Sequence, residues 1–147
     1  MACPFFYPLE RFDESAWRKH PRLPLGDPYS GACRADAERE WLPDQATLRG
    51  SCNVGYARDR CPRFPKDAGS DAFRFSVVSD EGGALKIFYI VERGHAPVEH
   101  GTIECAGGQF VNGHLGETLQ KQARAYVESY LRRKHEPDNE ARNPHRR

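Results

Sequence analysis

Four cysteines in the first half of the chain are the residues whose type and spacing point most directly to chemistry. The sequence of 147 residues contains five cysteines, and four of them precede Lys66: Cys3, Cys33, Cys52 and Cys61. An odd total leaves one thiol over in any set of disulfides. Thiols in a reducing compartment stay free unless a metal binds them. We therefore expect these four side chains to converge on one inorganic centre.

The residues next to these cysteines favour ligation of an inorganic cluster. Cys3 and Cys61 are each followed by proline, which brings no competing backbone donor. Cys33 and Cys52 are each preceded by a glycine and one small residue, which lets backbone N–H groups approach sulfur and offset negative charge. Aromatic residues near the cysteines could form a dry shell around the centre: Phe5, Phe6, Tyr7, Tyr29, Tyr56 and Phe64.

The spacing of the four cysteines favours an iron–sulfur cluster over zinc. Structural zinc sites commonly use a tight Cys-x2–4-Cys knuckle, whereas the gaps here are 30, 19 and 9 positions. Four single ligands from separate loops suit a 4Fe-4S cube, whose iron corners lie apart, and also suit some two-iron clusters. Over two residues, the Cys-Pro pairs resemble the last ligand of bacterial ferredoxins. The wide spacing is similar to the four-cysteine patches of some iron–sulfur nucleases and primases, whose catalytic motifs are not present in this chain.

Other interpretations of the thiols stay open. The same four residues could hold a structural zinc ion, or they could be buried or redox-reactive thiols without metal. Cys105 falls in a strand pattern, so we expect it to be a buried core thiol outside the ligand set.

Two weaker signals accompany the cysteines. Arg58, Arg60 and Arg63 surround Cys61 and could offset cluster charge or dock an acidic partner, although a solvated loop explains them equally well. A loop over 94–101 contains His95, Glu99 and His100, which could bind metal or shuttle protons. We favour a polar hairpin loop there, because Pro97 prevents helical spacing of the histidines.

Composition and missing motifs exclude several classes of function. Twenty-two basic residues face 21 acidic ones, a net charge of +1, so a strongly basic nucleic-acid binder is not expected. No apolar run approaches the roughly 18 residues of a membrane span, and the N-terminus lacks the pattern of a secretory signal. We therefore expect a cytoplasmic protein. Nucleotide-binding, serine-hydrolase and zinc-protease motifs are absent, so the sequence identifies no catalytic residue and favours a non-enzymatic role, with a small thiol enzyme as a third hypothesis.

The sequence thus predicts a small iron–sulfur protein with an electron-transfer, redox-sensing or structural role. It also predicts a protein partner, either a redox partner or an enzyme subunit, and neither membrane contact nor nucleic-acid binding. The alternative function is a protein-interaction module, stabilised by zinc or free of metal, without catalytic activity.

The elements that must position the cysteines change character near residue 66. Eight of the eleven prolines precede Lys66, so we expect loops and short helices over 1–66. Capping and proline signals predict these helices over 14–19, 33–41 and 44–48.

The second region, 71–135, has a different pattern. Apolar and β-branched residues predict short strands joined as an antiparallel meander, over 73–77, 84–92, 102–105 and 109–111. An apolar stripe predicts a helix over 114–135. We expect one α+β domain over 1–136, in which the cysteine-rich region packs on a small antiparallel sheet covered by the C-terminal helix. The two regions should share one core, and 137–147 should be a disordered tail.

Overall fold

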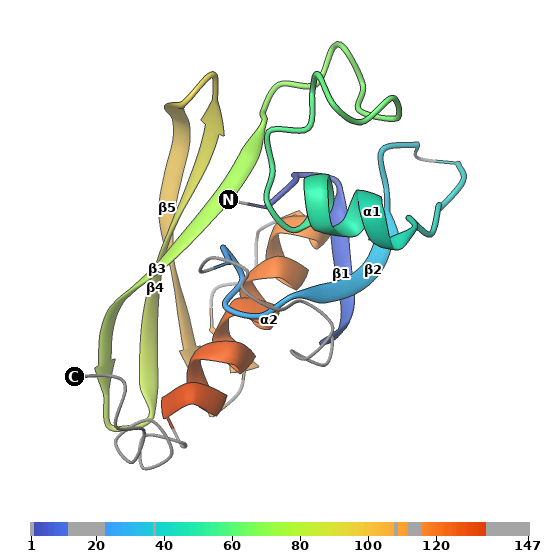
Figure 1. The fold of residues 1–147 in the computed structure, drawn as a ribbon. Coiled ribbons are helices and arrows are strands. Elements are labelled where there is room, and N and C mark those ends of the chain that lie inside the picture. The colour runs from blue at the N-terminus through green and yellow to red at the C-terminus, as the bar shows by residue number, and fades with distance from the viewer. Residues whose placement is uncertain (1, 12–22, 37, 108, 112–115, 135–147) are drawn as a thin grey trace, which may run out of the picture.

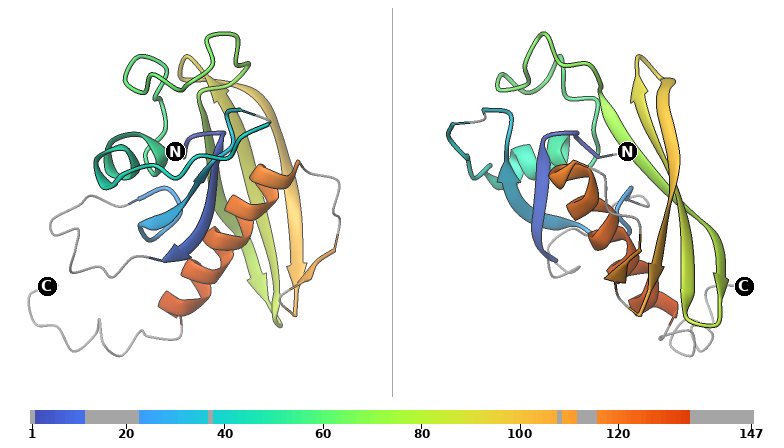
Figure 2. Two further views of the ribbon diagram at one scale, coloured as in Figure 1. Left: turned by 90° about the vertical axis from the view of Figure 1, so that its right-hand side faces the viewer. Right: turned by 180° about the vertical axis from the view of Figure 1, so that it is seen from behind.

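A long C-terminal helix lies between two antiparallel sheets (Figure 1). The structure is a computed structural model, and it describes residues 2–11, 23–36, 38–107, 109–111 and 116–134. Two further views show the four-stranded sheet on one side of the helix and the two-stranded sheet on the other (Figure 2). The α+β class, with a small sheet covered by a long helix, is therefore confirmed.

The larger sheet is the meander that the sequence predicts. Its strands pair in chain order: β3 (Ala72–Glu81), β4 (Ala84–Arg93), β5 (Ala96–Ala106) and β6 (Gln109–Phe110). Ile87 of β4 pairs with Ile103 of β5, and both side chains are buried on the face toward the helix. Gly82 and Gly83 both have positive φ, which forms the tight turn that the twist of a hairpin favours.

The segment 94–101 is not the loop that the sequence predicts. Gly94 and His95 form the turn, with φ of 60° and 68°, and β5 begins directly after it. The sequence predicts Gly101 at the end of a loop, but it lies inside strand β5. A Cβ atom on Gly101 would lie 2.9 Å from the Tyr89 ring, so glycine is required there by packing and not by a turn.

The predicted C-terminal helix corresponds to α2 (Glu117–Lys134). Leu119, Ala123 and Val127 lie on its buried stripe. Ser129, farther along the helix, is held by the Tyr29 hydroxyl, whose oxygen lies 2.7 Å from Ser129 Oγ. The helix therefore binds the smaller sheet through a buried polar contact as well as through apolar packing.

The smaller sheet was not predicted from the sequence. It pairs β1 (Phe6–Arg11) with β2 (Tyr29–Cys33). Pro8 reads as a strand breaker, yet an edge strand tolerates proline because its outer N–H groups need no partner strand. Gly31 allows the two strands to approach closely, since a Cβ there would meet the Tyr7 carbonyl oxygen at 2.2 Å.

The predicted helix over 33–41 is wrong. Cys33 ends β2, and its backbone then exchanges two hydrogen bonds with Trp41, of 2.7 and 3.1 Å. The segment is extended and not helical, because its two ends pair with each other in a β-bridge next to the end of β2.

The predicted helix over 44–48 is present but continues farther. α1 (Gln45–Thr47) is capped by Asp44, whose carboxylate accepts the Thr47 N–H at 2.8 Å. A π-helical turn, η2 (Leu48–Cys52), follows directly and extends past residue 48, where the predicted helix ends. The predicted helix over 14–19 and the predicted tail over 137–147 lie outside the described residues.

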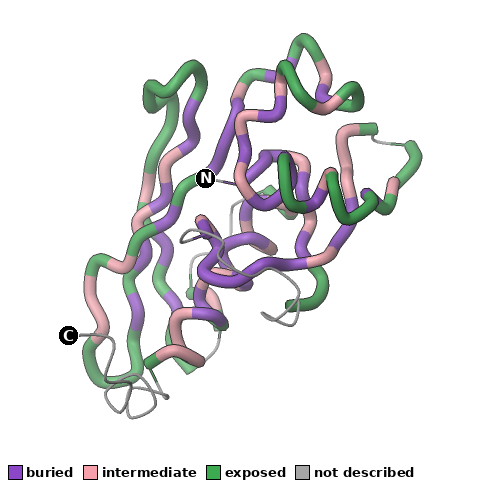
Figure 3. The backbone as a smooth tube through the Cα atoms, in the orientation of Figure 1, coloured by how far each residue is buried: buried purple, intermediate pink, exposed green. Residues whose placement is uncertain are grey.

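Buried side chains from both regions form one apolar cluster. The burial pattern follows the strands and the helix faces that meet between the two sheets (Figure 3). At the N-terminus, Ala2 and Phe73 exchange two backbone hydrogen bonds of 2.9 and 2.8 Å, which ties the first residues to β3. In the described part of the chain, no helix is long and apolar enough to span a membrane.

Gln122 is the buried polar residue that joins α2 to the first cysteine. Its Nε2 donates to the carbonyl oxygens of Cys3 and Phe6, both at 2.7 Å, and its side chain is fully buried. We predict that Gln122→Ala lowers the free energy of unfolding by about 2 kcal/mol, because two buried carbonyls lose their donor. Gln120→Ala, at a half-exposed position on the same helix, should change it by less than about 0.5 kcal/mol. Urea denaturation measures both values, and equal effects would contradict this role of Gln122.

Candidate metal centre

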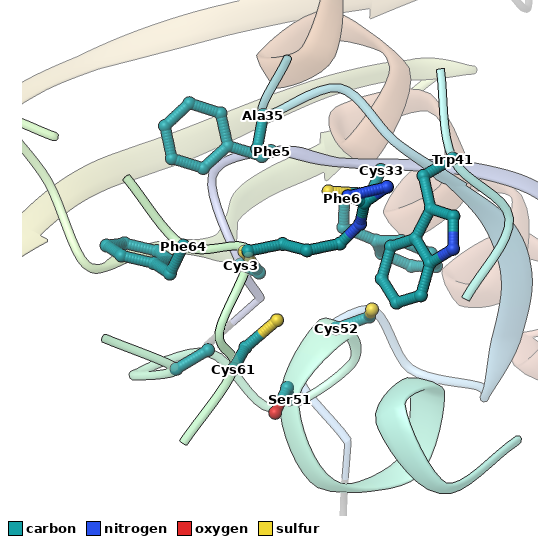
Figure 4. A pocket seen from close by; sticks show the side chains of 12 residues that line it. Cys3, Phe5, Phe6, Cys33, Ala35, Trp41, Ser51, Cys52, Cys61 and Phe64 are labelled. Atoms are coloured by element: carbon teal, nitrogen blue, oxygen red, sulfur yellow. The ribbon is translucent and has the colours of Figure 1, made fainter. Parts of the chain in front are cut away.

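The four cysteines of the N-terminal region line one cavity (Figure 4). The structure thus brings together all four residues that the sequence predicts as ligands. The sulfur atoms of Cys52 and Cys61 point into the space between the four side chains (Figure 4). The remaining walls are largely apolar and include Phe5, Phe6, Ala35, Trp41, Ser51, Ala57, Arg63 and Phe64.

Backbone hydrogen bonds hold the cysteines at this cavity. The Cys3 N–H donates to the carbonyl of Cys52 at 3.1 Å, so two predicted ligands are joined directly through their backbones. Cys33 is fixed by its bridge to Trp41. Cys61 lies in a turn in which its N–H donates to the Ala57 carbonyl at 2.8 Å.

The side chain of Asn53 fixes the segment that carries Cys52. Asn53 is buried, and its Oδ1 accepts the N–H of Tyr29 at 3.0 Å. Its Nδ2 donates to the carbonyls of Tyr29 and Leu48, at 2.9 and 3.0 Å. These three hydrogen bonds attach η2 to β2. They therefore fix the position of Cys52 relative to Cys33. The sequence analysis missed Asn53, because its role depends on a strand that the sequence did not reveal.

The loop that carries Cys61 is anchored by a partly buried ion pair. Arg58 Nε lies 2.8 Å from Asp71 Oδ1, and the guanidinium also donates to the carbonyls of Lys66 and Ala68. Asp71 in turn accepts the Gly94 N–H at 2.8 Å, so the loop is fastened to the β4–β5 turn.

The three arginines around Cys61 have separate roles. Arg58 belongs to the ion pair just described, and Arg60 donates to the carbonyls of Gly55 and Tyr56. Arg63 alone of the three is among the residues that line the cysteine cavity. Its guanidinium lies 4.3 Å from the centre of the Trp41 ring.

His95 takes part in a second anchor of the same loop. Its ring stacks on Tyr56 at 4.2 Å with 6° between the planes. The Tyr56 hydroxyl donates to Glu92 Oε1 at 2.7 Å and accepts the His95 N–H at 2.8 Å. His100 lies on β5, with its ring 5.7 Å from that of Phe88. The two histidines therefore have different surroundings, and nothing among the described residues joins them at one metal site.

Burial disfavours ionisation of these thiols. It raises the pKa of Cys3 to about 12, and the negative charges of Cys33 and Cys61 raise it further, while hydrogen bonds from the backbone of Phe5 and Phe6 lower it in part. Burial also raises the pKa of Cys52, with added repulsion from the other three sulfurs. The pKa of Cys33 is raised for the same reasons. Four thiolates can coexist here only if a positive centre binds them, because the surroundings supply too little compensating charge.

The backbone donors at these sulfurs come from unexpected residues. Backbone N–H groups of Phe5 and Phe6 donate hydrogen bonds to Cys3, and that of Ala35 donates to Cys33. The sequence analysis assigned this role to the preceding glycines, but Gly31 is required by the close approach of β1.

The cavity is small in this conformation. The space open to the centre of a water molecule is about 10 Å³, which is room for about one water. Among the described residues, no three His, Cys, Asp or Glu side chains are grouped closely enough to hold one metal ion. The four thiols therefore surround a space too small for a cluster in this conformation, and a group of several atoms would require the sulfurs to move apart.

Cys105 lies outside this site. It is buried in β5 with 4% of its surface exposed, as expected for a core thiol.

Comparisons of the chain with protein-family models, with curated proteins and with solved structures give no match.

Asp71 makes the position of the Cys61 loop sensitive to acid. Although burial raises its pKa, the Gly94 N–H and the Arg58 guanidinium lower it more, so its pKa in the folded protein lies below the ordinary 3.8. The stability that Asp71 contributes is therefore present above pH 4 and is lost as the pH falls through the folded pKa.

We predict that Asp71→Asn lowers the free energy of unfolding at pH 7 by about 2 kcal/mol, because a charged acceptor is removed. The variant should also lose less stability than the native protein between pH 5 and about pH 3. Urea titrations across this range measure both effects. Asp67→Asn, at an exposed position in the same loop, is the control and should keep the native pH dependence. The account of the loop fails if Asp71→Asn and Asp67→Asn behave alike.

Proposed function

We propose that this chain is an iron–sulfur protein that holds one cluster, by preference 4Fe-4S, on Cys3, Cys33, Cys52 and Cys61. The observation that carries the proposal is the meeting of four thiols from four separate segments at one apolar cavity. Residues that are 58 positions apart at the extremes reach the same place only because the two-stranded sheet, η2 and the following loop fold together.

The arrangement of the thiols supports a cluster in preference to zinc. One zinc ion draws four ligands around a single atom. In a 4Fe-4S cube each cysteine binds a different iron, so the ligands stand farther apart. Here the four thiols come from four separate segments and lack the tight Cys-x2–4-Cys knuckle of structural zinc sites, which favours the cluster.

The surroundings of the cavity also suit a cluster. Phe5, Phe6, Trp41 and Phe64 provide apolar walls that would limit access of water and oxidants. Hydrogen bonds from backbone groups to Cys3 and Cys33, and the nearby guanidinium of Arg63, would offset part of the negative charge of the bound cluster.

The uneven burial of the cysteines supports electron transfer as the role of the cluster. Cys3 and Cys52 are buried, whereas Cys33 and Cys61 are only partly covered. A bound cluster would supply one-electron redox chemistry, and its edge beside Cys33 and Cys61 would lie nearest to solvent. A purely structural cluster has no need of such an edge. Four thiols that bind a cluster must stay reduced, so the proposal places the protein in a reducing compartment such as the cytoplasm.

Metal analysis of protein purified without oxygen tests the proposal. We expect a brown protein with about four iron and four sulfide per chain. Cys3→Ala, Cys33→Ala, Cys52→Ala and Cys61→Ala should each lose most of the visible absorption and the iron. Cys105→Ala removes a buried thiol outside the cavity and should keep both, which makes it the matched control.

Two outcomes would overturn the proposal. A colourless protein with one zinc per chain would support the alternative of a zinc-stabilised interaction module. Full colour and iron content in Cys33→Ala would show that the ligand set is wrong.

A further inference from the structure

A second, open groove adjoins the cysteine cavity on its outer side. The groove has a volume of about 260 Å³. Cys33, Ala35, Trp41 and Arg63 line both spaces, so they form the wall between the groove and the cavity. An occupant of the groove would therefore lie one side chain away from a group bound by the cysteines.

The residues at this groove are of the types that protein interfaces favour. Trp41 and Arg63 form a cation–π pair at the wall, and Arg39 and Pro62 are exposed beside it. Leu42, next to Trp41 in the chain, has 71% of its surface exposed. Tryptophan and arginine are enriched in interfaces and carry much of their binding energy.

The charge of the groove is positive. Arg39 and Arg63 line it, and among the described residues neither forms an ion pair. One carboxylate, Asp36, lies at the same groove and accepts the N–H of Glu38 at 3.0 Å. Nearby Glu40 is engaged by Arg34 at 3.0 Å. Two guanidinium groups against one carboxylate leave a site that attracts acidic groups.

We propose that this groove is the docking surface for an acidic redox protein. The inference rests on the proposed function, since the docked partner exchanges one electron with the cluster through the wall at Cys33. When the partner is the electron acceptor, the reduced cluster loses one electron. A one-electron centre of the partner, such as a ferric haem, gains that electron. No covalent bond forms and no proton moves. Carboxylates of the partner would pair with Arg39 and Arg63, because a guanidinium binds a carboxylate through two parallel hydrogen bonds.

The groove favours a protein over a small anion. It is open to solvent, and Trp41 and Pro62 in its lining offer apolar contact area that a small anion would not use. Electron-transfer complexes are commonly small and weak, and charge complementarity sets their association rates. A groove of this size beside a bound cluster suits such an encounter.

Two forms of one acceptor protein test the inference. Native cytochrome c is basic, and cytochrome c with succinylated lysines is acidic while keeping the same haem. The loaded protein is reduced with dithionite, and stopped-flow absorption at low salt measures the rate of haem reduction for each form. We expect the acidic form to be reduced faster, with a preference that declines as salt is added.

Charge reversal then locates the surface. Arg39→Glu and Arg63→Glu should each lower the ratio of acidic to basic rates by about ten-fold. Lys86→Glu makes the same change of charge at an exposed position of β4 and should alter the ratio by less than about two-fold. Iron is measured in every variant. If Arg63→Glu loses iron because it lines the cavity, Arg39→Glu decides the question.

The two proposals fail in different ways. A native protein without iron overturns the cluster itself. A fully loaded protein whose rate ratio is the same in Arg39→Glu and Lys86→Glu overturns the docking surface and leaves the cluster in place.

Discussion

The burial of several thiols at one place is the constraint on which the N-terminal region depends. Burial raises the pKa of Cys3 and the pKa of Cys52, and negative charge on neighbouring sulfurs raises both further. Such a group is stable with its protons on, or with a cation that replaces them. In the metal-free protein, two backbone contacts keep the thiols together. They are the hydrogen bond between Cys3 and Cys52 and the β-bridge between Cys33 and Trp41. Binding of an iron–sulfur cluster would replace the thiol protons with iron, and the cavity would have to widen to admit the cluster.

The cysteine-bearing segments obtain their positions from the rest of the fold. α2 reaches them through Gln122, which donates to the carbonyl of Cys3 from inside the core. Asn53 fixes η2 against β2, and the Arg58–Asp71 pair fastens the Cys61 loop to the β4–β5 hairpin. The meander and helix therefore serve as a frame, and the site is assembled from pieces that have little regular structure of their own. A substitution in the meander or in α2 should therefore shift the cysteines, although the substituted residue lies outside the cavity.

The sequence predicted the second half of the chain better than the first for physical reasons. Strand alternation and a helical stripe are local signals, and the meander and α2 follow them. β1 and β2 are short, contain Pro8 and Gly31, and depend on each other across a long gap, so local patterns could not reveal them. The four cysteines that line the cavity could be named from their types and spacing, because thiol chemistry is specific. Asn53, Gln122 and Asp71 could not, because amides and carboxylates occur on every surface and their importance here comes from burial.

The central claim is that the four thiols bind iron in a multinuclear cluster. Mössbauer spectroscopy of protein produced with ⁵⁷Fe and purified without oxygen tests it most directly, because the spectrum distinguishes iron atoms that share electrons in a cube from isolated ones. The account predicts the spectrum of a cube of four irons and four sulfides in which every iron has four sulfur ligands, and this spectrum should be lost when Cys33 is replaced by alanine. Protein without bound iron, or with one isolated iron atom, would contradict it.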